Sequence, residues 1–373
     1  MKRFSFIFLL LVLVSCSSNS EDAIETSDTT VASTVGDSTE TTVISDNSTT
    51  TTVNNVFQYE FDIEKMSPFT GLELEPEIWL KRPRRAIAFK IDNNLNARPQ
   101  SGLQEADAVY EVLVEGGMTR FLAFFLDKSS SYLGPIRSAR PTDPTLVRPF
   151  GGTLVVSGAT EGLIPAIREL GVPVLEEQSS PTMFRISSRK APHNLYADTE
   201  LVRQKIDDRG FYFLQPGPVP LYPFGLDQTN WNDGAERITI KYSEFTTVIW
   251  KHNGQSYSRF IVDGYSNTKE AVAHNFTTQD GSYTDILKSE TIVIIQGPFY
   301  NDKATTLPSI LTVGVGDVYV ISDGKYVKGT WRRSDISDSF EFVDENQNPI
   351  YVPPSSQCVH IMSNDGTVTI SDI

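Results

Sequence analysis

A stretch that cannot form a core sets the main limit on what this 373-residue chain can fold into. Of the 40 residues from 17 to 56, 19 are Ser or Thr and seven are Asp or Glu, and none is Lys, Arg or Pro. Such a composition buries too little apolar surface to offset the entropy lost when a backbone is ordered. We therefore expect a disordered linker over residues 16–56 and a folded body that begins near Phe57.

The residues before this linker have the features of a secretion signal. Lys2 and Arg3 precede an apolar run, Phe4 to Val14, which is too short to span a bilayer but fits a signal-peptide core. Leu13-Val14-Ser15-Cys16 resembles the bacterial lipobox, which implies cleavage of residues 1–15 and attachment of lipid to Cys16. Two or more acyl chains hold a protein stably on a membrane. We expect a lipid anchor on the extracytoplasmic face of the cell membrane; secretion with a free Cys16 is the alternative.

The folded body divides into two parts with different patterns. Residues 57–215 alternate apolar runs with helical segments, which predicts an α/β domain. A Pro- and Gly-containing loop over 216–232 separates it from residues 233–373, where short apolar runs and turn signals predict a smaller, mostly antiparallel β domain. The expected strands are 86–91, 109–115, 120–126, 153–157, 246–250, 257–262, 291–296, 318–322, 325–331, 340–343 and 359–362.

Two helices are expected in the first part. Thr160 can cap a helix over residues 161–170, although Pro165 favours a regular start only near Ile164. Asp198 can cap a second helix over residues 199–209, which Gly210 would end.

Composition and motifs exclude several classes of function. A formal net charge of −15 argues against binding to nucleic acid, and two cysteines cannot form a disulfide framework or a zinc–thiolate cluster. Asp344-x-Asn346-x-Asn348 begins like a calcium loop, but Pro349 stands where the loop needs glycine, so we interpret it as a hairpin turn. Cys358 is expected to be a small buried hydrophobic residue rather than a nucleophile. The sequence predicts neither a metal site nor a cofactor.

Polar residues gather where the strands of the first part end. Five arginines, whose guanidinium groups suit carboxylate or phosphate, and one histidine accompany carboxylates and amides there. Solvated loops with structural ion pairs are the alternative, in which Glu115 and Arg120 would pair across a hairpin. Glu111 and Glu115, if on one strand, would lie about 13 Å apart, too far for the acid and base of a glycosidase. The candidate ligand-binding residues are Asp92, Asn93, Arg98, Glu111, Glu115, Arg120, Arg137, Arg140, Arg189, His193 and Asn194.

The same segments resemble a known family. The residues that carry the resemblance are Pro68-Phe69-Thr70-Gly71, Ile91-Asp92-Asn93, Ala97-Arg98-Pro99-Gln100-Ser101-Gly102, Val114-Glu115-Gly116-Gly117, Gly134-Pro135-Ile136-Arg137-Ser138-Ala139-Arg140-Pro141 and Lys190-Ala191-Pro192-His193-Asn194-Leu195-Tyr196. They are similar to YerB-like bacterial lipoproteins (domain of unknown function 3048), and Gly329-Thr330-Trp331 extends the similarity more loosely into the second part. The resemblance implies an extracytoplasmic lipoprotein with an N-terminal and a smaller C-terminal part. It implies no reaction.

These observations favour a non-catalytic binding or scaffolding role at the cell envelope, with an anionic or glycan ligand. The expected partners are the membrane, through the lipid on Cys16, and a cell-wall polymer or wall-synthesis proteins. Two alternatives stay open. One is an envelope hydrolase that uses Asp92, Glu111 or His193, and the other is a scaffold that contacts only proteins.

Overall fold

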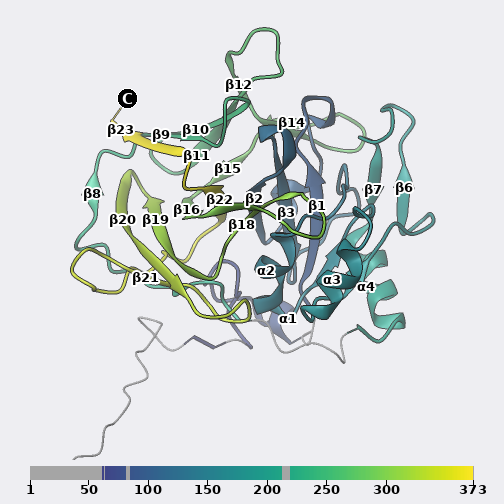
Figure 1. Ribbon diagram of the computed structural model, residues 1–373, viewed down its shortest axis with the longest axis horizontal. Coiled ribbons are helices and arrows are strands. Elements are labelled where there is room, and N and C mark those ends of the chain that lie inside the picture. The colour runs from purple at the N-terminus through teal and green to yellow at the C-terminus, as the bar shows by residue number, and fades with distance from the viewer. Residues whose placement is uncertain (1–60, 63, 81–84, 212–218, 373) are drawn as a thin grey trace, which may run out of the picture. The chain divides into compact units, whose positions relative to one another are not determined.

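The structure, a computed structural model, describes residues 61–62, 64–80, 85–211 and 219–372 (Figure 1). The signal peptide, Cys16 and the linker, and residues 216–218 of the expected interdomain loop, lie outside the described residues. Within the described ranges, no helix combines the length and apolar character needed to cross a membrane. The α-helices there are short: α1 (Pro76–Trp79), α2 (Asp143–Val147), α3 (Leu163–Glu169) and α4 (Thr199–Asp208).

A large mixed sheet forms the centre of the fold. Its strands lie in the order β21-β20-β19-β16-β22-β2-β3-β1-β4-β5, and β8 adds to β20. The strands of the N-terminal part are β1 (Ile87–Asp92), β2 (Ala108–Leu113), β3 (Thr119–Phe125), β4 (Thr153–Val155) and β5 (Val174–Leu175). Those of the C-terminal part are β8 (Asn232–Asp233), β16 (Thr291–Gly297), β19 (Gly314–Ser322), β20 (Lys325–Arg333), β21 (Glu341–Val343) and β22 (Gln357–Ser363).

A second sheet comes entirely from the C-terminal part, in the order β12-β11-β10-β9-β23, with β15 added to β11. Its strands are β9 (Arg237–Lys241), β10 (Thr246–His252), β11 (Tyr257–Asp263), β12 (Ala271–Ala273), β15 (Lys288–Ser289) and β23 (Thr367–Ser371). Three two-stranded ribbons complete the fold: β6 (Met183–Arg185) with β7 (Leu195–Ala197), β13 (Asn275–Thr277) with β14 (Thr284–Ile286), and β17 (Phe299–Asn301) with β18 (Pro308–Ile310).

The expected fold class is confirmed, with a mixed sheet and few helices in the N-terminal part and mostly antiparallel strands in the C-terminal part. The two parts nevertheless share one sheet. Strand β22 pairs in parallel with β2 on one side, Val109 opposite Cys358, and with β16 on the other, Thr291 opposite Gln357. Every residue of β22 is buried, as is usual for a strand covered on both faces.

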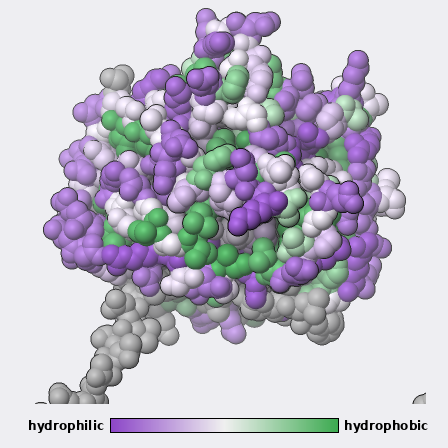
Figure 2. All heavy atoms as spheres, viewed as in Figure 1, coloured by the Kyte–Doolittle hydropathy of each residue, from purple (hydrophilic) through white to green (hydrophobic). Residues whose placement is uncertain are grey.

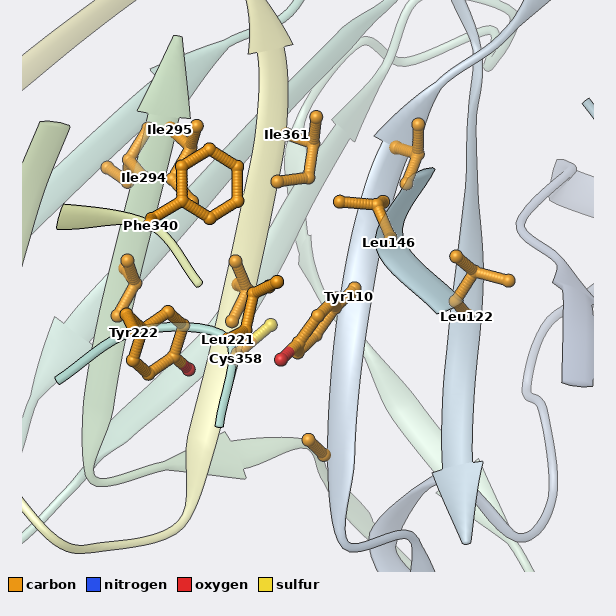
Figure 3. Packing of buried hydrophobic residues seen from close by; sticks show 14 of the residues in the cluster. Tyr110, Leu122, Leu146, Leu221, Tyr222, Ile294, Ile295, Phe340, Cys358 and Ile361 are labelled. Atoms are coloured by element: carbon orange, nitrogen blue, oxygen red, sulfur yellow. The ribbon is translucent and has the colours of Figure 1, made fainter. Parts of the chain in front are cut away.

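The shared sheet has one continuous core. Figure 3 shows Tyr110 of β2, Ile361 of β22 and Ile294 and Ile295 of β16 on neighbouring strands of that core. Cys358 lies among them and is 6% exposed, which agrees with its expected role as a small buried hydrophobic residue. Each Å² of apolar surface that is buried stabilises the folded state by roughly 25 cal/mol. Because residues from both parts bury their apolar surface in this one core, the two parts stabilise each other.

Most of the expected elements are observed. The starts of the two expected helices differ in whether the predicted capping residue is used. Asp198 caps α4: its carboxylate accepts hydrogen bonds from the backbone N–H groups of Glu200 (2.9 Å) and Leu201 (3.1 Å). The expected cap at Thr160 is wrong, because Gly162 adopts a φ of +82° and α3 begins only after it. Pro165 then falls in the first turn, where its missing N–H has no partner to lose.

The Asp344 segment is a turn, as expected. The carboxylate of Asp344 accepts hydrogen bonds from the backbone N–H of Asn346 and Asn348, both at 2.8 Å, and Gln347 has a φ of +67°.

Polar side chains cover much of the face seen in Figure 2, while apolar residues gather over α2 and β18.

Candidate functional site

The candidate site lies at one edge of the main sheet. Strands β1 and β4 are parallel, so their carboxyl ends meet at this edge, which is where ligands bind in open α/β sheets. The loop over residues 134–140 is held there because the backbone N–H of Arg137 donates to the carbonyl of Lys90 (2.8 Å). The N–H of Ser157 donates in turn to the carbonyl of Arg137 (3.0 Å).

Asp92, the last residue of β1, gathers two cationic or ionisable side chains. His193 Nδ1 lies 2.6 Å from Asp92 Oδ2, and Arg137 Nε lies 3.1 Å from the same oxygen. An ionised carboxylate can only accept, so Nδ1 is the donor and Nε2 of a neutral His193 is left as an acceptor. Arg137 Nε is close enough for a charge contact but not aligned for a hydrogen bond.

Glu115 binds two further arginines. Arg140 donates to it through Nε (2.5 Å) and through a terminal nitrogen, and Arg120 donates through its own terminal nitrogen (3.2 Å). Burial raises the pKa of Glu115, but its bonds with Arg140 and the charge of Arg120 outweigh this and lower the pKa to about 2. Burial, and then the charge of Arg140, lower the pKa of Arg120 to about 10.

The expected pairing of Glu115 with Arg120 is therefore present, but the expected strand position of Glu115 is wrong. Strand β2 ends at Leu113, and Glu115 begins a 3₁₀ turn, Glu115–Gly117. Gly116 and Gly117 both have positive φ, which ends the extended conformation. Since Asp92 is also the cross-strand partner of Arg120, six side chains form one group. We call Asp92, Glu115, Arg120, Arg137, Arg140 and His193 the β1-edge cluster.

Glu111 lies instead in a fully buried polar network. Arg259 donates to both of its carboxylate oxygens (2.8 and 2.7 Å), and Thr119 donates at 2.7 Å. Burial raises the pKa of Glu111, but the charge of Arg259 and the contact with His360 lower it to about 2. With no exposed surface, Glu111 cannot reach a ligand at the sheet edge, so its expected role as an acid or base receives no support from the geometry.

Imidazole groups and aromatic donors complete this network. His360 Nδ1 lies 2.8 Å from the Tyr242 hydroxyl, and Trp250 Nε1 donates to His360 Nε2 (2.9 Å). Burial, and then the charge of Arg259, hold the pKa of His274 well below its ordinary value. His274 Nε2 lies 2.8 Å from the side-chain oxygen of Gln100.

The remaining candidate residues organise loops. Arg98 pairs with Asp263 (2.8 Å) and donates to the side chain of Asn93 (3.0 Å), while Arg189 donates to the backbone carbonyls of Ala97 and Pro99. The side-chain oxygen of Asn194 accepts from Arg185 at 2.9 Å. Within the described residues, none of these four side chains pairs with the carboxylate of Asp92 or Glu115, so we leave Asn93, Arg98, Arg189 and Asn194 out of the β1-edge cluster.

A buried ion pair, which the sequence analysis missed, fixes one of the loops that form the β1-edge cluster. Lys90 Nζ lies 2.6 Å from Asp143 Oδ1, with neither side chain exposed. The other oxygen of Asp143 accepts from the backbone N–H of Arg140 (2.7 Å), so the pair fixes the loop that carries this arginine. Lys90 inside an otherwise apolar strand was the available signal, because a charge on a buried strand requires a partner. Arg259, also missed, had no comparable local signal.

Within the described ranges, no three His, Cys, Asp or Glu side chains are placed to hold a metal ion. What the β1-edge cluster can do chemically is bind an anion through guanidinium groups and accept or deliver a proton at His193 Nε2.

Comparisons with known proteins identify relatives of the chain. It is 32% identical to "Putative lipoprotein YerB" of Bacillus subtilis (strain 168) over 220 residues, a match that spans 58% of this chain and 59% of that relative's length. The crystal structure of YerB protein from Bacillus subtilis superposes with a TM-score of 0.67 at 22% identity, covering 82% of this chain and 99% of that one, so the fold is shared.

Two family models match the chain. The model described as "Protein of unknown function (DUF3048) N-terminal domain" matches residues 69–212, and the model of the corresponding C-terminal domain matches residues 238–356. The domain boundaries drawn from the sequence stay predictions, since these matches leave the limits of each part open. Together the two matches cover well over half of the sequence, and the chain belongs to this DUF3048 family, the family of the YerB-like lipoproteins.

Proposed function

We propose that this protein is a lipid-anchored binding protein of the bacterial cell envelope, and that the β1-edge cluster binds an anionic group of its ligand. The observation that carries the proposal is the state of Arg137. Its side chain is 21% exposed, and among the described residues it makes no side-chain hydrogen bond. Its Nε is buried against Asp92, so the terminal nitrogens are the donors left for a carboxylate or phosphate.

The charges around Arg137 favour the same ligand. Among the residues that the structure describes, Arg120, Arg137 and Arg140 pair with two carboxylates, Asp92 and Glu115, which leaves one positive charge uncompensated. Because the arginines are partly withdrawn from water, their attraction for an anion is screened less than on an open surface. The net charge of the whole chain does not oppose this, since the local sign is positive.

A binding experiment tests the proposal. We would titrate the protein with glycerol 3-phosphate, N-acetylmuramic acid and uncharged N-acetylglucosamine, and measure heats of binding at low and high salt. We expect the two anions to bind, more weakly at high salt, and Arg137→Ala to abolish the signal. Arg332→Ala is the matched control, because exposed Arg332 lies six strands from β1, about 29 Å away. Equal binding by both variants would refute the anion site.

The anchor is tested separately. Because Cys16 ends the lipobox-like sequence, Cys16→Ala should move the protein from the membrane to the soluble fraction or leave an unprocessed precursor. Unchanged processing and membrane fractionation would rule out the lipid anchor without touching the binding proposal.

One observation favours a second candidate function, an envelope hydrolase. The 2.6 Å contact between Asp92 and His193 orients an imidazole whose Nε2 could serve as a general base. His193→Gln preserves hydrogen bonding but removes proton transfer. If wild-type protein cleaves purified wall polymer and His193→Gln does not, the hydrolase is supported; binding without turnover in either form supports the binding protein.

A further inference from the structure

His193 and Arg137 offer a ligand two different hydrogen-bonding groups that lie close together. Both side chains are held by one oxygen, Asp92 Oδ2, which lies 2.6 Å from His193 Nδ1 and 3.1 Å from Arg137 Nε. These two nitrogens are therefore at most 5.7 Å apart, the sum of the two distances. His193 Nε2 and the terminal nitrogens of Arg137 are each separated from them by a single carbon atom, so one small ligand can reach both side chains.

The outer atoms of both side chains are accessible. The side chains of His193 and Arg137 are 18% and 21% exposed. Among the described residues, His193 Nε2 and the terminal nitrogens of Arg137 make no hydrogen bond, and none of them is a buried atom, whereas Arg137 Nε is both buried and without such a bond. The outer atoms therefore meet solvent, which a ligand can replace.

Donor and acceptor roles are fixed on this pair. The ionised carboxylate of Asp92 can only accept, so His193 Nδ1 donates to it and Nε2 of the neutral ring is an acceptor. The terminal nitrogens of Arg137 can only donate, and they carry positive charge. The pair is therefore complementary to a ligand that offers anionic oxygens to Arg137 and a hydroxyl proton to His193. A carboxylate or phosphate without a hydroxyl can use only Arg137.

The neighbouring charges agree with this division. Oδ1 of Asp92 accepts from the backbone N–H of Asn94 (3.0 Å), so both oxygens of this carboxylate already have partners. Lys190, whose carbonyl accepts from the backbone N–H of His193 (3.0 Å), is exposed and brings a further positive charge into the same loop. An anion placed against Nε2 would meet an acceptor, so the anionic end of a ligand belongs on Arg137 and its hydroxyl on His193.

We propose that the β1-edge cluster selects ligands that carry a hydroxyl within a few bonds of an anionic group, as polyol phosphates and hydroxy acids do. The anionic group bonds to Arg137, and the hydroxyl donates to His193 Nε2. This inference rests on the proposed anion site and adds the specificity of that site, for which His193 is the determining residue.

Matched ligands test the inference on the wild-type chain. Calorimetric titration at pH 8, where phosphate monoesters carry two charges and have no proton of their own to donate, would compare glycerol 3-phosphate with propyl phosphate. We expect glycerol 3-phosphate to bind about fivefold more tightly, because propyl phosphate gives Nε2 no donor. Glycerate and propionate repeat the comparison with a carboxylate, and the pair that binds more tightly identifies the anion.

Two substitutions of His193 form a matched set. In glutamine the amide nitrogen and oxygen are joined through one carbon atom, as the two imidazole nitrogens are, so His193→Gln can donate to Asp92 and still accept from a hydroxyl. His193→Leu can do neither. We expect His193→Gln to keep a preference for glycerol 3-phosphate. His193→Leu should bind both phosphates equally, with an affinity for propyl phosphate close to that of the wild type because Arg137 is still present.

The outcomes separate this inference from the anion site on which it rests. If neither phosphate binds to the wild type, the anion site itself is wrong and the inference falls with it. If both bind equally, the anion site stands and the selectivity for a hydroxyl is overturned. A preference that persists in His193→Leu would overturn it too, since the hydroxyl would then contact another group. If His193→Leu does not fold, His193→Phe, which keeps a ring without nitrogen, takes its place.

Discussion

Arg137 and Arg140 lie three residues apart in one loop, yet their side chains differ in what they do. Arg140 is 6% exposed, bonds to Glu115 through two nitrogens and donates to the carbonyl of Ala139 (2.7 Å). Within the described part of the chain, the side chain of Arg137 makes a charge contact with Asp92 and no hydrogen bond. Arg140 therefore builds the cluster, whereas Arg137 presents donors to a ligand.

This difference predicts that the two alanine substitutions change stability by different amounts. Arg140→Ala should lower the free energy of unfolding by about 1–2 kcal/mol, because Glu115 loses its strongest partner but keeps Arg120 and some solvent. Arg137→Ala should change it by less than about 0.5 kcal/mol. Urea unfolding of both variants would measure this, and a larger loss for Arg137→Ala would show that Arg137 is structural.

Acid stability depends on the Glu111–Arg259 pair. The pKa of Glu111 is about 2 in the folded protein against an ordinary 4.5, so the folded state holds fewer protons and favours the ionised form. Its contribution to stability is complete above pH 4.5 and is lost as the pH falls toward 2. We expect Glu111→Gln to be less stable than wild type at pH 7, with the gap narrowing below pH 4.5. A gap that is independent of pH would show that ionisation of Glu111 is irrelevant.

At the scale of elements, sequence patterns predict the turns and strands that depend on residues close together in the chain. The hairpin of β10 and β11 formed around Asn253-Gly254 because Gly254 takes the positive φ that its turn requires. The partners of Glu111 could not be predicted, since Arg259 is 148 residues away and only strand packing brings it close. The approach of His193 to Asp92 over 101 residues has the same cause.

Helix α4 gives a test at this scale. Asp198→Ala removes the acceptor of two backbone N–H groups and should cost about 1 kcal/mol of unfolding free energy. Asp208→Ala, at the other end of the same helix, is the matched control and should be neutral or slightly stabilising, because an acid is unfavourable at a helix C-terminus. Thermal melts would compare them, and equal losses would show that the cap is not the cause.

At the scale of the whole molecule, the sheet order makes the two family parts interdependent. Strand β22 lies between β16 of the C-terminal part and β2 of the N-terminal part, so neither part has a complete sheet alone. A fold that joins distant segments in this way should unfold in one cooperative transition rather than two.

Truncation tests this interdependence. A chain that ends at residue 355 loses β22, which exposes the backbone groups of β2 and β16 and removes Val359 and Ile361 from the core. We expect it to be insoluble or to show no cooperative thermal transition. A chain that ends at residue 365 keeps β22 and loses only β23, an edge strand of the second sheet, so it should stay folded with a lower melting temperature. If the shorter chain melted cooperatively near the temperature of the longer one, the N-terminal part would be an independent domain and the shared strand would be dispensable.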